Sequence, residues 1–365
     1  MIYLADGPGA LRRFVLPGLF VIALFATQFL RSGVDDEADV LTHRFVGPTM
    51  GTQYTVKVVA SGLGEARQGQ LAQAIVDQLE GVNAEMSTYR PDSALSQINA
   101  RKDTAAVSVS PALAAVLTEA VAIHGASGGA FDVTVGPLVN AWGFGPDGRQ
   151  KTPTVPEINA LKSRVGQSLL GWDRSAKTLS KGHPEVYVDL SAIAKGYAVD
   201  RVARALDDLA QRNYYVDVGG EVRVRGKNAD GVPWRVGVER PDAGRGAVQE
   251  ILHLEAMSVA TSGDYRNYYE QNGARISHTI DPRTGRPITH GLASVTVLHR
   301  DCMTADAWAT ALNVLGPKDG PALARERGLA VLFIIRGPDG GFTVERTGDL
   351  ARYIRPPTVG IVTED

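Results

Sequence analysis

The stretch Tyr214-Tyr-Val-Asp-Val-Gly-Gly-Glu-Val-Arg-Val-Arg225 decides the fold class, because it holds two short β-branched runs separated by two glycines. Such runs are typical of strands joined by a turn. More runs of this kind follow without an intervening helix, and we expect strands at Trp234–Glu239, Gln249–Leu254, Met257–Ala260, Leu292–Leu298 and Leu329–Ile335. Strands that succeed one another directly favour antiparallel pairing.

Helices are expected on both sides of this stretch. Apolar residues recur at helical spacing in Glu65–Met86 and Ser191–Arg212, with Ser191 as the N-cap, and Ser110-Pro111 opens a helix to about Ser127. The chain therefore has an α+β fold. We expect one composite domain of mainly antiparallel sheet with packed helices, over residues 40–350, followed by a tail at 351–365.

The N-terminus has the pattern of an export segment. Arg12-Arg13 precede the uncharged apolar run Phe14–Leu30, whose 17 residues lie at the lower limit for a membrane span. We interpret residues 1–35 as a signal-anchor; a cleaved signal peptide and a buried helix are the alternatives. The positive-inside rule then puts the bulk of the chain on the periplasmic, extracytoplasmic side of the inner membrane.

Composition excludes several classes of protein. The net charge is −2 and there is no block of Lys and Arg, so we expect no nucleic-acid partner. The single cysteine, Cys302, excludes an intrachain disulfide, and no cysteine follows the apolar run to accept a lipid.

The run Cys302-Met-Thr-Ala-Asp306-Ala-Trp-Ala-Thr310-Ala-Leu312 suggests a chemical function. Four residues apart on a helix, a carboxylate and a hydroxyl share one face, about 6 Å apart along the axis. Two hard oxygen donors suit Mg²⁺. A solvated or hydrogen-bonded pair is the alternative.

Four other polar motifs carry candidate site residues. Met50-Gly51-Thr52 interrupts an alternating strand pattern over Phe45–Val59, as a β-bulge or as a point of close backbone approach. Tyr89 ends a helix and either stacks on a ring or covers a core edge. In Asp189-Leu-Ser-Ala-Ile-Ala-Lys195, the lysine lies near a helix N-terminus, which attracts anions. His278 is either a general base at a strand end or a structural histidine.

Together and in order, these motifs closely resemble the ApbE family, the FAD:protein FMN transferases. The matching segments span roughly residues 45–335 and are Met50-Gly-Thr, Tyr89-Arg-Pro-Asp-Ser, Gly129-Ala-Phe-Asp-Val-Thr-Val-Gly-Pro, Asp189-Leu-Ser-Ala-Ile-Ala-Lys-Gly, Asp217-Val-Gly-Gly-Glu, Thr261-Ser-Gly-Asp-Tyr, His278-Thr-Ile-Asp-Pro and Ala305-Asp-Ala-Trp-Ala-Thr.

The resemblance implies an enzyme that uses FAD as its substrate. Such an enzyme moves the FMN half of FAD onto a threonine or serine hydroxyl of an acceptor protein and releases AMP, with Mg²⁺ as the required cofactor. Carried over residue by residue, it assigns catalysis to His278 and Asp306 and metal binding to Ala192, Asp306, Ala309 and Thr310. It assigns FAD contacts to Met50, Tyr89, Ala130, Phe131, Asp132, Asp189, Lys195 and Ile280.

The resemblance also implies the partners. Acceptors in such families are flavoprotein subunits of membrane redox complexes, of the NADH:quinone reductase or Rnf type. Many members carry a lipoprotein cysteine that this chain lacks, which leaves the apolar segment as its means of membrane attachment. Two alternatives remain open: a Mg²⁺-dependent FAD pyrophosphatase, and a non-catalytic protein that binds and delivers FAD.

Overall fold

The structure is a computed structural model that describes residues 40–146, 152–241, 247–263, 268–271, 274–337 and 339–354. The expected signal-anchor at residues 1–35 lies outside these ranges. Within them, no helix combines the length and the apolar character that crossing a bilayer requires.

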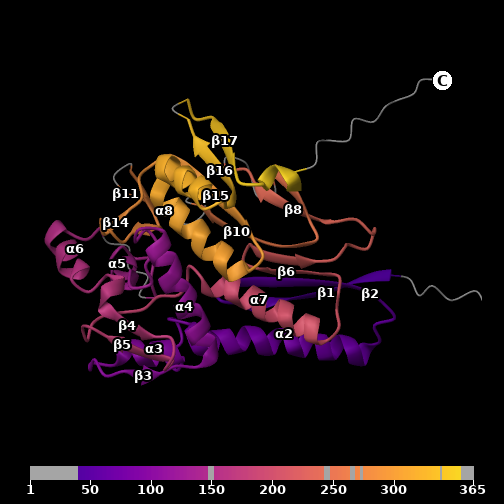
Figure 1. Ribbon diagram of the computed structural model, residues 1–365, viewed down its shortest axis with the longest axis horizontal. Coiled ribbons are helices and arrows are strands. Elements are labelled where there is room, and N and C mark those ends of the chain that lie inside the picture. The colour runs from indigo at the N-terminus through magenta and orange to yellow at the C-terminus, as the bar shows by residue number, and fades with distance from the viewer. Residues whose placement is uncertain are drawn as a thin grey trace, which may run out of the picture. The chain divides into compact units, whose positions relative to one another are not determined.

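An eight-stranded sheet runs through the described part of the chain (Figure 1). In sheet order its strands are β1 (Val40–Thr49), β2 (Thr52–Ser61), β6 (Tyr214–Val218), β7 (Glu221–Arg225), β10 (Ala256–Gly263), β15 (Leu292–His299), β16 (Ala330–Arg336) and β17 (Phe342–Thr347). All pairings from β2 to β17 are antiparallel, which confirms the expected sheet type.

The Met50-Gly51 dipeptide forms the turn between β1 and β2. Both residues have positive φ, 48° and 71°, as a two-residue hairpin turn of type I′ requires. The β-bulge alternative is therefore wrong, because the chain reverses direction here and two strands replace the single interrupted one.

Helices cover one face of the sheet. Figure 1 shows α2 (Glu65–Met86), α7 (Ala194–Asp208) and α8 (Cys302–Glu326) side by side, and α4 (Pro111–Ala126) packs against α2 and α8. The first of these helices has the predicted bounds, and Ser110 caps α4 as predicted.

The predicted start of α7 is wrong. The helix begins at Ala194 with Ile193 as its N-cap, and not at Ser191. The reason is local: the Asp189 carboxylate accepts the Ser191 N–H at 2.9 Å, which stabilises a turn in place of the first helical residues. Lys195 consequently lies in the first turn of α7.

The hairpin of β8 (Trp234–Glu239) and β9 (Val248–Leu254) packs against the opposite face of the sheet. Alternate residues of β16 therefore enter different cores. Val331 and Phe333 pack with the helices, whereas Leu332 and Ile334 pack with the hairpin, as the period of two in a strand dictates.

Smaller elements form one end of this unit. They are α3 (Ala94–Ala100), α5 (Gly136–Ala141), α6 (Val155–Lys162), the sheet of β3 (Val107–Ser108), β5 (Thr178–Lys181) and β4 (Leu170–Asp173), the hairpins β11 (Tyr268–Gln271) with β12 (Ala274–Ser277) and β13 (Ile280–Asp281) with β14 (Arg286–Pro287), and the 3₁₀ turn η1 (Gln167–Leu169). The 3₁₀ turn η2 (Leu350–Tyr353) lies elsewhere, against β9, β16 and β17 in the hairpin core. The Trp142 indole N–H donates to the Gly285 carbonyl at 3.0 Å and ties α5 to the β13–β14 hairpin.

Candidate active site

The N-terminal turns of α7 and α8 meet at Gly196 and Asp306. The Asp306 side chain is 5% exposed, and its Oδ2 accepts the Gly196 N–H at 2.9 Å. A Cβ on Gly196 would lie 2.8 Å from Asp306 Cβ and would overlap the Cys302 carbonyl oxygen. Only glycine permits so close an approach, so it brings Asp306 next to the turn that carries Ala192.

Lys195 and Glu221 form an ion pair beside Asp306. Lys195 Nζ donates to Glu221 Oε1 at 2.6 Å, and the Glu221 side chain is 3% exposed. Burial lowers the pKa of Lys195, but the charges of Glu221 and Asp306 outweigh burial and raise the pKa above its usual value. The lysine is thus a fixed ammonium group.

Both carboxyl groups have raised pKa values. Burial raises the pKa of Asp306, and Lys195 and the Gly196 N–H lower it only in part. Burial also raises the pKa of Glu221; Lys195 lowers it and the charge of Asp306 raises it. Two buried carboxylates share one ammonium group, so the fully ionised cluster carries a net negative charge.

The donor set at this junction fits Mg²⁺. Thr310 is half-buried one turn after Asp306, and Ala192 is half-buried in the turn before α7. Their oxygens and the Asp306 carboxylate are the hard donors that Mg²⁺ prefers. In addition, Glu221 Oε2 is buried without a hydrogen-bond partner among the described residues, an acceptor that a water on the cation could satisfy.

A cation at this junction would not have a cluster of acidic and histidine side chains as its ligands. Across the ranges that the structure describes, no group of three or more His, Cys, Asp or Glu side chains is arranged to hold a metal. A cation here would take its other ligands from hydroxyl, main-chain or water oxygens. Ala309 is buried in the helical core, so only its main chain is available for such a role.

His278 lies between β12 and β13, on a segment that contacts α8. Asn313 Nδ2 lies 3.5 Å from Thr279 Oγ1, and Asn313 is three residues after Thr310, on the same side of the helix. The His278 ring is half-buried and meets the Phe144 ring edge-on, with the centroids 6.2 Å apart. Ile280 is buried with Trp142 in a small core of its own.

The Asp132 carboxylate stabilises its own loop. Oδ1 accepts the Thr134 N–H at 2.8 Å and the Thr134 hydroxyl at 2.6 Å, and Oδ2 accepts the Gln167 N–H at 3.1 Å. The neighbouring side chains of Ala130 and Phe131 are 1% and 2% exposed. Side-chain contacts from these two residues to a ligand would require the loop to open.

Tyr89, Asp189 and Met50 lie outside the helices and strands. Tyr89 is 66% exposed, and partial burial of its hydroxyl, together with the negative charge of Asp189, raises its pKa. The Asp189 N–H donates to the Val133 carbonyl at 2.7 Å, so this segment also lies against the Asp132 loop. Met50 packs against the helical core.

Two polar residues at the junction received no role from the sequence. Glu221 follows the Gly219-Gly220 turn, and Asp200 is 1% exposed on α7. The sequence does contain a signal for both: each is an ionisable residue at a position that the strand or helix pattern assigns to the core.

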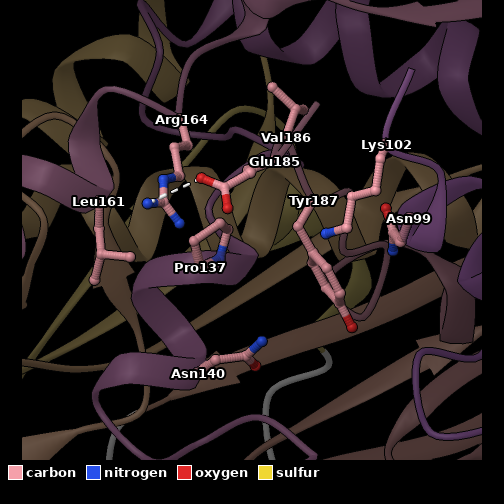
Figure 2. A pocket seen from close by; sticks show the side chains of 9 residues that line it. All are labelled: Asn99, Lys102, Pro137, Asn140, Leu161, Arg164, Glu185, Val186 and Tyr187. Carbon is pink, nitrogen blue, oxygen red and sulfur yellow. Dashed lines mark ion pairs between the residues drawn. The ribbon is translucent and has the colours of Figure 1, made fainter. Parts of the chain in front are cut away.

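A separate cavity of about 290 Å³ contains none of the predicted site residues (Figure 2). It is lined by Asn99, Lys102, Pro137, Asn140, Leu161, Arg164, Glu185, Val186 and Tyr187. Figure 2 shows Arg164 paired with Glu185, at 2.9 Å, and Asn99 is bonded to both main-chain groups of Val188. These groups satisfy one another, so we do not assign the chemistry to this cavity.

The chain is similar to characterised proteins over most of its length. A sequence model of the ApbE family matches residues 50–333. An FAD:protein FMN transferase from Vibrio cholerae is 46% identical over 322 residues, which cover 88% of this chain and 95% of that protein. One from Salmonella typhimurium is 43% identical over 324 residues, or 86% and 92% of the two chains.

Solved structures agree with this. The flavin transferase ApbE from Vibrio cholerae superimposes with a TM-score of 0.80 at 44% identity, covering 86% of this chain and all of that one. The apo flavinyl transferase ApbE from Pseudomonas stutzeri gives a TM-score of 0.79 at 39% identity, with coverage of 87% and 98%. The resemblance drawn from the motifs is confirmed, and the chain belongs to the ApbE family.

Proposed function

We propose that this protein transfers the FMN half of FAD to a threonine or serine hydroxyl of an acceptor flavoprotein and releases AMP. The names of its relatives and their identity over most of the chain support this activity. The observation that carries it at the level of residues is the buried Asp306 carboxylate, fixed by Gly196 beside the Lys195–Glu221 pair.

The reaction is a displacement at phosphorus. The acceptor oxygen forms a bond to the phosphorus of the FMN half, the bond from that phosphorus to the bridging oxygen breaks, and AMP leaves with that oxygen. Positioning and charge neutralisation dominate such reactions. A Mg²⁺ ion held by Asp306, Thr310 and the main chain of Ala192 and Ala309 would supply positive charge to the pyrophosphate oxygens.

His278 takes the proton of the acceptor hydroxyl in this proposal. Histidine is the side chain that most often takes a proton in general-base catalysis. Its position on a segment that contacts α8 three residues after Thr310 supports the role. Met50, Tyr89, Ala130, Phe131, Asp132, Asp189, Lys195 and Ile280 would form the FAD site, with Tyr89 as its most exposed member.

The cellular setting is part of the proposal. Residues 1–35 would anchor the chain in the inner membrane, with the 40–350 domain on the periplasmic side. This follows from Arg12-Arg13 before the apolar Phe14–Leu30. Flavoprotein subunits of NADH:quinone reductase or Rnf-type complexes, with their FMN domains on that side, would be the acceptors.

Mass spectrometry of an acceptor domain tests the function. The purified chain is mixed with FAD, Mg²⁺ and an acceptor that carries the target threonine, and with a threonine-to-valine acceptor as control. We expect one FMN per acceptor and one AMP per FMN, with the valine acceptor and the Asp306→Asn enzyme both inactive. AMP without a labelled acceptor would establish the pyrophosphatase instead, and neither product would refute the proposal.

A further inference from the structure

In the first turns of α7 and α8, main-chain N–H groups donate hydrogen bonds to a carboxylate of the other helix. Asp200, on α7, accepts the Cys302 N–H through Oδ1 and the Met303 N–H through Oδ2, both at 3.0 Å. In the other direction, Asp306 on α8 accepts the Gly196 N–H of α7 at 2.9 Å. These amides belong to the first turns of their helices, where no main-chain partner exists.

The two sets of hydrogen bonds have the same spacing in the sequence. Asp200 is four residues after Gly196, and Asp306 is four residues after Cys302, so each carboxylate lies one turn beyond the amide that its own helix donates. Gly196, which cannot carry a Cβ here, marks the point of contact. Each carboxylate also meets the positive end of the opposite helix dipole, which stabilises the pair of contacts.

Asp200 is held from the sheet side as well. Its side chain is 1% exposed, and Arg223 of β7 donates to Oδ1. Arg223 is two residues after Glu221, so the strand that supplies the Glu221 carboxylate also supplies the charge partner of Asp200. A buried carboxylate with an arginine and two amide donors has a single well-defined orientation.

We infer that Asp200 is a positioning residue of the cation site, acting by locking α8 onto α7. The inference rests on the proposed function, because the proposed ligands come from both helices: Asp306 and Thr310 from α8, and Ala192 from the turn that leads into α7. The hydrogen bonds that join α7 to α8 therefore determine how far the oxygens of Asp306 and Thr310 lie from the Ala192 carbonyl. Within the part of the chain that the structure describes, Asp200 has no hydrogen bond to these ligands and acts through the first turn of α8.

The test measures Mn²⁺ binding to the full chain by electron paramagnetic resonance, without turnover. Replacing groups that orient metal ligands typically costs 10–100-fold in metal affinity. We expect Asp200→Ala to weaken Mn²⁺ binding by about 10-fold on this basis. We expect a smaller loss for Asp200→Asn, whose amide oxygen can still accept one of the two N–H groups.

Asp207→Asn is the matched control. Asp207 lies on the same helix and pairs with Arg225 of the same strand, but its side chain is 29% exposed, and its partners, Arg225 and the Tyr214 hydroxyl, belong to β7 and β6 and not to α8. We expect unchanged Mn²⁺ affinity for it. Hydrogen–deuterium exchange gives a second readout: the Cys302 and Met303 amides should exchange faster in Asp200→Ala and stay protected in Asp207→Asn.

The outcomes separate this inference from the proposed function. If Mn²⁺ binding depends on Asp306 but folded Asp200→Ala keeps the wild-type affinity, or if its α8 amides stay protected, the positioning role is wrong and the function stands. If Asp200→Ala does not fold, the same comparison is made with Asp200→Asn. If Asp306→Asn leaves Mn²⁺ binding intact, the cation is elsewhere, and both the positioning role of Asp200 and the proposed set of metal ligands are wrong, whereas FMN transfer is still decided by the labelling of the acceptor.

Discussion

At the residue scale, the junction of α7 and α8 collects two buried carboxylates, Asp306 and Glu221, around the single ammonium group of Lys195. Burial makes an uncompensated carboxylate costly, and a cation is the direct means of compensating it. This is a physical reason to expect a cation at the proposed site, and it is independent of the resemblance to other proteins.

Replacing His278 tests the proton acceptor. General-base catalysis contributes typically 10²–10⁴-fold, so we expect His278→Ala to slow acceptor labelling about 100-fold while FAD affinity stays unchanged. Initial labelling rates and a fluorescence titration with FAD measure the two effects. His183→Ala, which changes another half-buried histidine outside the predicted site, should label at the wild-type rate. A wild-type rate for His278→Ala would remove this residue from catalysis.

Asp217 should make stability depend on pH. Burial raises its pKa above the ordinary 3.8, although the Gly220 N–H and the Tyr215 hydroxyl oppose the shift. The folded protein therefore binds this proton more readily than the unfolded chain, and stability falls as pH rises from about 4 through the folded-state pKa. Asp217→Asn cannot lose this stability. Its free energy of unfolding should therefore exceed that of the wild type at pH 7 and differ little from it at about pH 3.5.

Urea denaturation of both proteins at the two pH values measures this advantage. The amide oxygen that Asp217→Asn introduces can still accept the Gly220 N–H, which keeps the comparison close to a change of charge alone. An advantage of equal size at both pH values would show that Asp217 does not titrate in this range with a raised pKa.

At the element scale, the packing of α7 on α8 depends on one glycine. A methyl group at Gly196 meets the Cys302 main chain, which cannot rotate away as a flexible side chain could. We expect Gly196→Ala to lose about 1–3 kcal/mol of stability, as overpacked sites do, and to slow labelling because it separates the two helices.

Gly81→Ala in α2 is the control for helix propensity. Nothing lies within 4 Å of a Cβ at that position, so the same substitution should gain about 0.5–1 kcal/mol. Thermal denaturation of both variants measures the contrast. If Gly196→Ala is as stable and as active as Gly81→Ala, the close helix contact is not what positions Asp306.

The sequence predicted the individual elements better than their arrangement. Local periodicity was sufficient for α2, for β6 and β7, and for the helical run around Asp306, since these patterns depend on neighbours in sequence. The turn at Met50 was missed because a positive φ at methionine is uncommon, and the start of α7 because the Asp189 carboxylate competes for the Ser191 amide.

The candidate site was predictable only through the motifs. The spacing of Asp306 and Thr310 follows from the helix period, but the contacts of Asp306 with Gly196 and of Lys195 with Glu221 join residues 110 and 26 positions apart. Such contacts depend on which helix packs where, and local patterns do not contain that information. Asp200 was missed for the same reason.

At the scale of the whole described unit, one sheet separates two cores. Leu332 and Phe333 are both fully buried neighbours in β16, yet the first faces the β8–β9 hairpin and the second faces the helices. The central strands therefore connect the hairpin core to the core that supports the site, and we expect the two to unfold together.

Two substitutions with two tryptophan probes test this coupling. Leu332→Ala should cost about 2–5 kcal/mol and Phe333→Ala about 3–5 kcal/mol. Trp234 reports on the hairpin core and Trp308 on the helical core, so single-tryptophan versions of each protein can be followed by fluorescence in urea. Each variant should show one transition, with the same midpoint from both probes; separate midpoints would mean that the cores are independent.

The most direct test of the central claim is the position of the cation. Crystals of the chain grown with FAD and Mn²⁺, measured at the manganese absorption edge, should show an anomalous peak about 2.0–2.4 Å from the Asp306 carboxylate, the Thr310 hydroxyl and the Ala192 carbonyl. The same crystals of Asp306→Asn should lack it. If manganese occupies another place in an active crystal, with nothing between α7 and α8, the account of the site given above is wrong.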